Sequence, residues 1–400
     1  MNPMNIVITG IGVVAPNGIG KEAFLRNCEA GISGIKPINL FETQDFRCHW
    51  AGEISDFQPE SFLGQKGLRN LDRTTLLCLV AAKLAIDDAR FEVTPDNSNG
   101  IGVVLGSTMG SVKSISDFDL VGLREGPRSV NPAHFPNTVI NSPASHVAIR
   151  FGLRGLNSTI STGFTASHDA LGYALDMLRL GRVKTLLVGG VEELCFQTFL
   201  GFYKVGLLER RWKKFEAPSR LNELSGGTLL GEGAAFFVLE SADAAEARGA
   251  QVLAEVLAHS NIFHPLGIRR IDPQGTGLSL AIQDVLRQSD VSADSIEELS
   301  HSENGIPQWI ASEQAGIEAV LGARSRNLPR TAIKHLLGES FSAGGAMQLA
   351  HCIARRSAAV ASGAAISTDI RSAGATDVNH GHVLVTGFGP TGVSSSVILK

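Results

Sequence analysis

Apolar residues recur along the chain at two spacings that alternate. Within residues 170–178 they lie three or four positions apart, which predicts a helix with one buried face. The apolar run at 186–188 is closed by two glycines and predicts a short buried strand. Small polar residues at 161–167 precede the helix, so a tight turn is expected there, with helix N-terminal amides pointing outward. Such a turn can hold an anion or an oxyanion.

The same alternation extends over the whole chain. Strands are predicted within 5–16, at 101–105, within 231–240 and at 252–258, and helices at 76–89 and about 111–123. A similar order of segments occurs near residues 5, 100 and 160 and again near 253, 296 and 340, which indicates an internal repeat. We therefore predict an α/β protein of two related halves, residues 1–250 and 251–400.

Residues 131–145 break the alternation, because Pro132, Pro136 and Pro143 exclude a single regular element. The segment still carries the apolar residues Phe135, Val139 and Ile140, which need cover. We expect it to line a site or an interface.

Composition narrows the classes of function. The chain has 400 residues, 44% of them hydrophobic, and only 18% are charged, with a net charge of −4. This composition suits a large core and argues against nucleic-acid binding. The main basic cluster, at 210–214, is interpreted as solvated surface, with docking of an acidic carrier protein as the alternative.

The cysteines and the hydropathy pattern indicate the compartment. Five cysteines lie far apart without CxxC spacing, so neither disulfides nor zinc is expected. No stretch approaches 18 uninterrupted apolar residues, and the first strand begins without a basic and apolar leader. The pattern predicts a soluble cytoplasmic protein that has no membrane partner.

Short patterns in the chain partly match three other kinds of site. Gly10, Gly12 and Ala15 formally match a dinucleotide fingerprint, but Pro16 makes a turn where its helix should run. Ser161 or Thr165 with His168 and Asp169 would suit a hydrolase, yet no GxSxG elbow is present. His380 and His382 share one face of a strand start but have no evident third metal ligand, so a surface pair is the preferred interpretation.

The helix HDALGYALDMLRLG and the turn before it resemble the β-ketoacyl synthases of the thiolase superfamily. The resemblance implies a thiolase-like fold with five layers in αβαβα order. In the family a nucleophilic Cys occupies this turn, and here that position is Phe164. A phenyl ring can be neither ionised nor acylated, so the position has lost its nucleophile.

Two segments of the second half, 296–322 and 331–353, resemble those that carry the ketosynthase histidines. The resemblance puts Ser302 and Glu339 at the two histidine positions. His301 lies beside Ser302, but strand alternation should turn its side chain to the opposite face. Glu339 needs a partner if it is buried, and Lys334 is the expected one. The C-terminal VTGFGPTGVSSSVIL resembles the family's gating loop, with Pro390 as a stiffening departure.

A complete frame with an incomplete catalytic set most resembles the chain length factors, the ketosynthase β subunits of type II polyketide synthases. VVAPNG, EGPRSV, ENGIP and SAGGA support this resemblance. It implies a heterodimer with a Cys-containing ketosynthase α subunit, and malonyl and polyketide substrates carried on the phosphopantetheine of an acyl carrier protein. The chain itself then needs no cofactor and has no condensing activity of its own.

The resemblance also implies that Val112, Ile115 and Asp119 gate a tunnel whose volume sets product length. The alternative for this helix face is ordinary interface core. Family members often carry Gln where this chain has Phe164, and Phe cannot hydrogen-bond to a malonyl group, so a decarboxylating role is not expected. Two further functions stay open: an active synthase with an unusual site, and a purely structural ketosynthase partner in a polyene or fatty acyl pathway.

Overall fold

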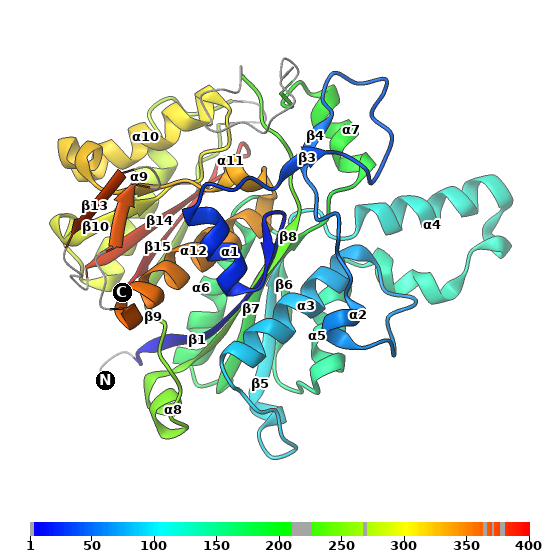
Figure 1. Ribbon diagram of the computed structural model, residues 1–400, viewed down its shortest axis with the longest axis horizontal. Helices are drawn as coiled ribbons and strands as arrows, with labels where there is room; N and C mark the ends of the chain where they lie inside the picture. The colour runs from blue at the N-terminus through cyan, green and yellow to red at the C-terminus, as the bar shows by residue number, and fades with distance from the viewer. Residues whose placement is uncertain (1–3, 210–225, 267–269, 363–365, 370–371, 377–380) are drawn as a thin grey trace.

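The computed structural model (Figure 1) describes residues 4–209, 226–266, 270–362, 366–369, 372–376 and 381–400. The basic cluster at 210–214 and His380 lie outside these residues. Ten of the described strands form one hydrogen-bonded path, and β2 (Gly18–Ile19) pairs beside it with β1 to complete an 11-stranded sheet. None of the described helices is long and apolar enough to cross a membrane.

The first half of the path runs in the order β1-β8-β7-β5-β6. The pairs β1–β8 and β8–β7 are antiparallel, whereas β7–β5 and β5–β6 are parallel. The strands are β1 (Ile6–Ala15), β5 (Ile101–Gly106), β6 (Asn157–Ile160), β7 (Thr185–Glu192) and β8 (Gly233–Ser241).

The second half repeats this order and these directions. In β9-β15-β14-β10-β11 the first two pairs are again antiparallel and the last two parallel. The strands are β9 (Ala254–Phe263), β10 (Ile296–Ser300), β11 (Arg330–Thr331), β14 (His382–Phe388) and β15 (Val393–Leu399). Pairing of Ile6 with Val256 joins the halves. The internal repeat is therefore confirmed, while a boundary at residue 250 stays a prediction.

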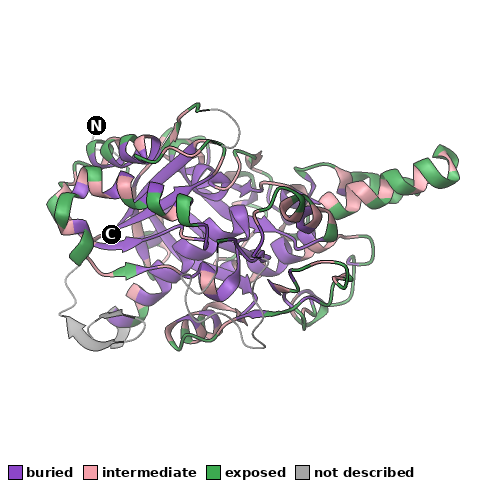
Figure 2. Cartoon of the chain, turned by 90° about the horizontal axis from the view of Figure 1, so that it is seen from above, coloured by how far each residue is buried: buried purple, intermediate pink, exposed green. Residues whose placement is uncertain are grey.

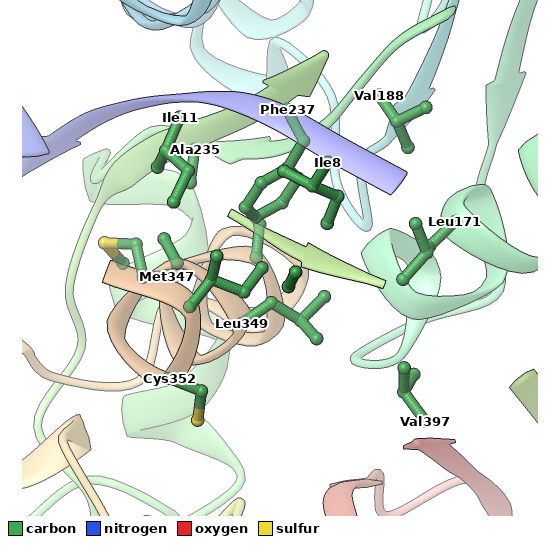
Figure 3. Close-up of a cluster of buried hydrophobic side chains, with 14 of the residues drawn as sticks. Ile8, Ile11, Leu171, Val188, Ala235, Phe237, Met347, Leu349, Cys352 and Val397 are labelled. Carbon is green, nitrogen blue, oxygen red and sulfur yellow. The ribbon is translucent and has the colours of Figure 1, made fainter. Parts of the chain in front are cut away.

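Helices separate and cover the two halves of the sheet (Figures 1 and 2), which confirms the layered thiolase-like arrangement. α6 (Ala166–Arg179) and α12 (Phe341–Ser362) lie between the halves. α3 (Arg73–Asp88) and α5 (Ser142–Phe151) cover the outer face of the first half, and α9 (Thr276–Ser289) and α10 (Pro307–Leu321) that of the second. Figure 3 shows part of the central core, a cluster of buried side chains that includes Phe237 of the first half, Val397 of the second and Met347 of α12.

Gly10 and Gly12 allow α3 to pack closely against β1. A Cβ at Gly12 would lie 2.0 Å from the carbonyl oxygen of Ala81, and one at Gly10 would lie 2.4 Å from that of Ala85. Both glycines are inside β1, where α3 crosses the strand closely. The formal dinucleotide fingerprint thus reflects contact between a strand and a helix.

One helix projects from the body. α4 (Val112–Glu125) extends away from the sheet in both views (Figures 1 and 2) and has no buried residue. It packs on η2 (Pro127–Ser129), η3 (Pro132–Thr138) and α7 (Phe196–Lys204). We call α4, η2 and η3 the arm.

The proline-rich segment 131–145 is not one regular element, as predicted, but it is more ordered than expected. Its first part forms η3, and its last residues begin α5 at Ser142. Pro143 stands in the first turn of α5, where a missing N–H costs nothing.

The remaining elements connect these layers. They are α1 (Lys21–Glu29), β3 (Ile35–Pro37), β4 (Trp50–Gly52), α2 (Glu60–Leu63), η1 (Ser98–Gly100), α8 (Ala242–Ala247), η5 (Ala293–Ser295), η6 (Gly322–Asn327), α11 (Lys334–Leu337), β12 (Ile366–Asp369) and β13 (Ser372–Thr376).

Candidate functional site

Phe164 lies in the turn between β6 and α6, directly before the helix N-terminus. Gly163 enters this turn at φ +94°, a conformation that glycine adopts without strain. The Phe164 ring packs among three other aromatic rings, with centroid distances of 4.9 Å to Phe341, 5.7 Å to Trp309 and 6.4 Å to Phe202. The position that the resemblance assigns to a nucleophile is therefore filled by an aromatic cluster.

Glu339 and Lys334 form a buried ion pair, as the sequence predicted. The Lys334 ammonium lies 2.9 Å from Oε2 of Glu339 and also donates to Oγ of Ser302 at 3.0 Å. Asn304 Nδ2 donates to the same Glu339 oxygen at 3.0 Å, and the amide of Phe341 donates to Oε1 at 2.8 Å. Ser302 and Glu339 thus meet through one lysine and form a hydrogen-bonded polar network.

Sequence reasoning missed two members of this site. Glu313 on α10 accepts the Ser302 amide at 2.7 Å and the Thr386 hydroxyl at 2.6 Å. Burial raises the pKa of Glu313 to about 7. Asn304 was the other omission, although it stands in the quoted ENGIP segment. The helical pattern of 307–321 gave no signal for Glu313, because an acidic residue on a helix is ordinarily solvated.

His301 does not replace its neighbour. Its side chain is buried, its Nδ1 lies 3.7 Å from Glu303, and neither ring nitrogen has a hydrogen-bond partner among the described residues. Burial lowers the pKa of His301 to about 3, with a smaller contribution from Arg330. Within this chain His301 is a core residue.

The hydroxyls of the turn do not form a hydrolase triad. Thr165 donates to Oδ2 of Asp169 at 3.0 Å, and the other oxygen of Asp169 lies 3.1 Å from His259 Nε2. His168 pairs through Nδ1 with Ser395 at 2.8 Å, and burial lowers the pKa of His168 to about 4. Ser161 instead donates to the carbonyl of Thr108. These residues stabilise the start of α6.

The C-terminal glycine-rich loop closes over Phe164. A Cβ at Gly389 would lie 3.3 Å from Cβ of Phe164, and Phe388 packs on Trp309 and Ile306. The hollow beside Phe388 and Pro390 has a volume of only about 20 Å³, room for roughly one water.

By their helical spacing Val112, Ile115 and Asp119 share one face of α4, which we call the outward face. The opposite face, with Ser114 and Asp117, borders two cavities of about 420 and 470 Å³, and neither cavity is lined by the three predicted positions. Val112 and Ile115 are half-buried, and Asp119 is exposed. Within this chain the three positions form a surface and are not part of the Phe164 cluster.

No group of three or more His, Cys, Asp or Glu in the described part of the chain could hold a metal ion. His382 lies with its Nδ1 3.3 Å from the carbonyl of Ser295.

Comparison with models of protein families shows to which family the chain belongs. Residues 4–245 match the β-ketoacyl synthase N-terminal domain, and residues 253–361 match the β-ketoacyl synthase C-terminal domain. The chain belongs to the β-ketoacyl synthase family. Its frame is thus that of a condensing enzyme, with Phe164, Ser302 and Glu339 at the positions discussed above.

Curated relatives are named as 3-oxoacyl-[acyl-carrier-protein] synthases. The chain is 29% identical over 353 residues to 3-oxoacyl-[acyl-carrier-protein] synthase 2 of Vibrio cholerae, covering 87% of this chain and 85% of the relative. It is 26% identical over 345 residues to the synthase of the same name from Synechocystis, covering 86% and 83%.

Two solved structures of polyketide systems share the fold. The ishigamide ketosynthase/chain length factor superposes with a TM-score of 0.80 at 26% identity, over 99% of both chains. A type II polyketide ketosynthase bound to a hexaketide and to its acyl carrier protein superposes with a TM-score of 0.85 at 22% identity, over 100% of both chains. The second likeness concerns the fold alone.

Proposed function

We propose that this β-ketoacyl synthase homologue is a non-catalytic chain length factor. It pairs with a Cys-containing ketosynthase and shapes the tunnel into which the growing chain extends. The substrates are malonyl and polyketide groups on an acyl carrier protein, and the ketosynthase performs the condensation.

The observation that carries this proposal is the aromatic cluster around Phe164. Decarboxylative condensation needs a thiolate to hold the acyl chain and imidazoles to stabilise the developing enolate. Here a phenyl ring is packed 4.9 Å from Phe341, and Glu339 is tied to Lys334. Phe164 is packed among aromatic rings, and Ser302 and Glu339 are joined through Lys334, so each of the three residues has a structural role in this chain.

A free sheet edge supports a partner of the same fold. β6 ends the strand order and pairs only with β5 among the described strands. Such an edge presents unpaired backbone groups to another strand. Beside it, the arm exposes Leu123 at 83% and Phe135 at 59%. We propose that the ketosynthase covers this edge and the arm, through an interface of more than about 2,000 Å².

The outward face of α4 supports a role in length control. Val112 and Ile115 are apolar, belong to a helix without buried residues and do not line the cavities of their own chain. A partner docked on the arm would place them at the junction of the two subunits. Side-chain volume there would then limit the space for the product.

A second candidate function is favoured by the curated relatives, which are named as active synthases. In that case another residue would have to carry the acyl group. Intact-protein mass spectrometry after incubation with acyl-carrier substrates separates the candidates. We expect no adduct on this chain and one on the co-purified ketosynthase. An adduct mapping to 161–167 would overturn the proposal.

Co-expression with ketosynthases encoded beside this chain's gene tests the pairing. We expect a stable heterodimer that makes products of defined length. A chain that stays monomeric at micromolar concentration beside those partners would refute the pairing. A heterodimer in which α4 substitutions never alter product length would favour the purely structural role.

A further inference from the structure

The N-terminus of α4, a helix of 14 residues, is capped by a side chain from another element. Its N-cap residue Ser111 makes no side-chain capping hydrogen bond, and the buried Ser111 hydroxyl has no partner among the described residues. The amides of a first helical turn have no partners within the helix and need acceptors. The acceptor comes from another element: Oε1 of Glu193 lies 3.0 Å from the amide of Lys113.

Glu193 directly follows β7, so its position is fixed by the central sheet. Its side chain is 5% exposed. A carboxylate at a helix N-terminus also interacts favourably with the helix dipole. The charged groups near it are Asp72 and Arg73 of α3 and Glu232.

The preceding residue, Glu192, holds the turn that leads into α4. Its carboxylate accepts the amides of Thr108 and Met109, the latter at 3.2 Å, and the Ser107 hydroxyl at 3.2 Å. Ser107 Oγ in turn accepts the Gly110 amide at 3.0 Å. Consecutive carboxylates at the end of one strand thus fix consecutive parts of the root of α4, residues 107–113.

Residues 107–113 are also linked to the turn that carries Phe164 and to the start of α12. Thr108 Oγ1 donates to the carbonyl of Gly163 at 2.8 Å and accepts the amide of Ser342 at 3.2 Å. Gly163 precedes Phe164, and Ser342 is in the first turn of α12. The turn that carries Phe164 therefore also supports α4.

We propose that Glu192 and Glu193 are positioning residues that fix the direction in which α4 leaves the body, and that through α4 they set product length. The part on product length rests on the proposed function, whereas the part on α4 does not. Neither carboxylate lies on the outward α4 face, so both act without touching the product.

The first measurement is the direction of α4 in the full chain. All five native cysteines are buried, so cysteines introduced at the exposed positions Arg124 on α4 and Glu60 on α2 can be spin-labelled selectively. Pulsed electron–electron double resonance then gives the distribution of distances between the label on the arm and the label on the body. We expect one narrow distribution in the parent protein.

Four variants test the role of Glu193. Glu193→Ala and Glu193→Leu both remove the acceptor but differ in volume, and we expect each to broaden or shift the distribution. Glu193→Gln keeps an acceptor oxygen and should restore the parent distribution. Asp88→Ala is the matched control, because it also removes a carboxylate that accepts a backbone amide, that of Ile11 at 2.8 Å. Asp88 lies at the far end of α3, about 24 Å along the helix from Asp72. Thermal unfolding identifies variants that fail to fold. If Glu193→Ala fails to fold, Glu193→Leu alone provides the test.

The second measurement is product length in the reconstituted pair. We expect Glu193→Leu to spread the product lengths over at least one extension unit, with Glu193→Gln and Asp88→Ala unchanged. An unaltered distance distribution in both the Ala and Leu variants overturns the positioning role, whatever the chain does with polyketides. An altered distance distribution with unchanged product length overturns the link between Glu193 and product length. If Val112→Phe also leaves product length unchanged, the proposed function is refuted as well.

Discussion

The Lys334 ammonium lies 2.9 Å from the carboxylate of Glu339, and the two side chains are only 5% and 1% exposed. Asn304 and the Phe341 amide satisfy the carboxylate further. Burial of either charge alone would be costly, so each residue requires the other. The pair joins α11 to the residues that lead into α12.

Removal of one partner of this pair should destabilise the protein strongly. We expect Glu339→Ala to lower the free energy of unfolding by about 3–5 kcal/mol, because it leaves the Lys334 cation buried and unpaired. Asp87→Ala is the control. It breaks the more exposed Lys83–Asp87 pair and should cost less than about 1 kcal/mol. Urea unfolding measures both, and equal losses would contradict the interpretation.

Restoring a thiol should not restore condensation. We expect Phe164→Cys to form no condensed product from malonyl and acyl carrier substrates, because Ser302 and Glu339 cannot act as imidazoles. The rate should stay at least about 10²-fold below that of a ketosynthase assayed in parallel, as for loss of a catalytic acid or base. Mass analysis of products provides the measurement. A rate close to that of the ketosynthase would show that the remaining residues still support catalysis.

Bulk on the outward face of α4 should shorten the product. We expect Val112→Phe to remove one or more extension units while complex yield stays nearly unchanged, since the ring would fill tunnel space. Val121→Phe is the matched control, because Val121 lines the cavity on the opposite face. If Val112 is instead interface core, overpacking should weaken association by about 1–3 kcal/mol without changing length. Product mass and subunit affinity separate the two outcomes.

Glu192 should make stability depend on pH. Burial raises its pKa from 4.5 to about 8, so between these values the folded protein binds the proton more tightly than the unfolded chain. Its contribution is therefore present below pH 4.5 and is lost as the pH rises through 8. We expect Glu192→Gln to make the fall in unfolding free energy between about pH 5 and 8 less steep, by at most about 1.4 kcal/mol per pH unit. Thermal unfolding across this range measures the slope. The exposed Glu246→Gln is the control, and an identical slope in all three proteins would contradict the assignment.

Two glycine substitutions should change the stability of the protein in opposite directions. Gly12→Ala would place a Cβ 2.0 Å from the Ala81 carbonyl, and we expect it to destabilise the protein by about 1–3 kcal/mol or more. Gly201→Ala has open space in α7 and should stabilise by up to about 1 kcal/mol through helix propensity. Thermal unfolding tests both. A tolerated alanine at Gly12 would show that α3 can move away from β1.

Local patterns in the sequence were sufficient for the elements of the fold. The apolar spacing at 170–178 and the run at 186–188 correspond to α6 and β7, because the period of a buried face is a property of each segment alone. The resemblance, which implies a structural lysine at Lys334, was enough to predict the pairing of Lys334 with Glu339.

The remaining features depend on contacts between segments distant in the chain. Glu313 joins the site only because α10 returns beside β14, and Glu193 caps α4 across 80 positions of sequence. The aromatic cluster draws Phe164, Phe202, Trp309 and Phe341 from four separate segments. No local period encodes such encounters, since a side chain's neighbours are set by how the layers pack. The sequence by itself determined the elements and their repeat, whereas packing of the layers decided which residues surround Phe164 and how α4 is held.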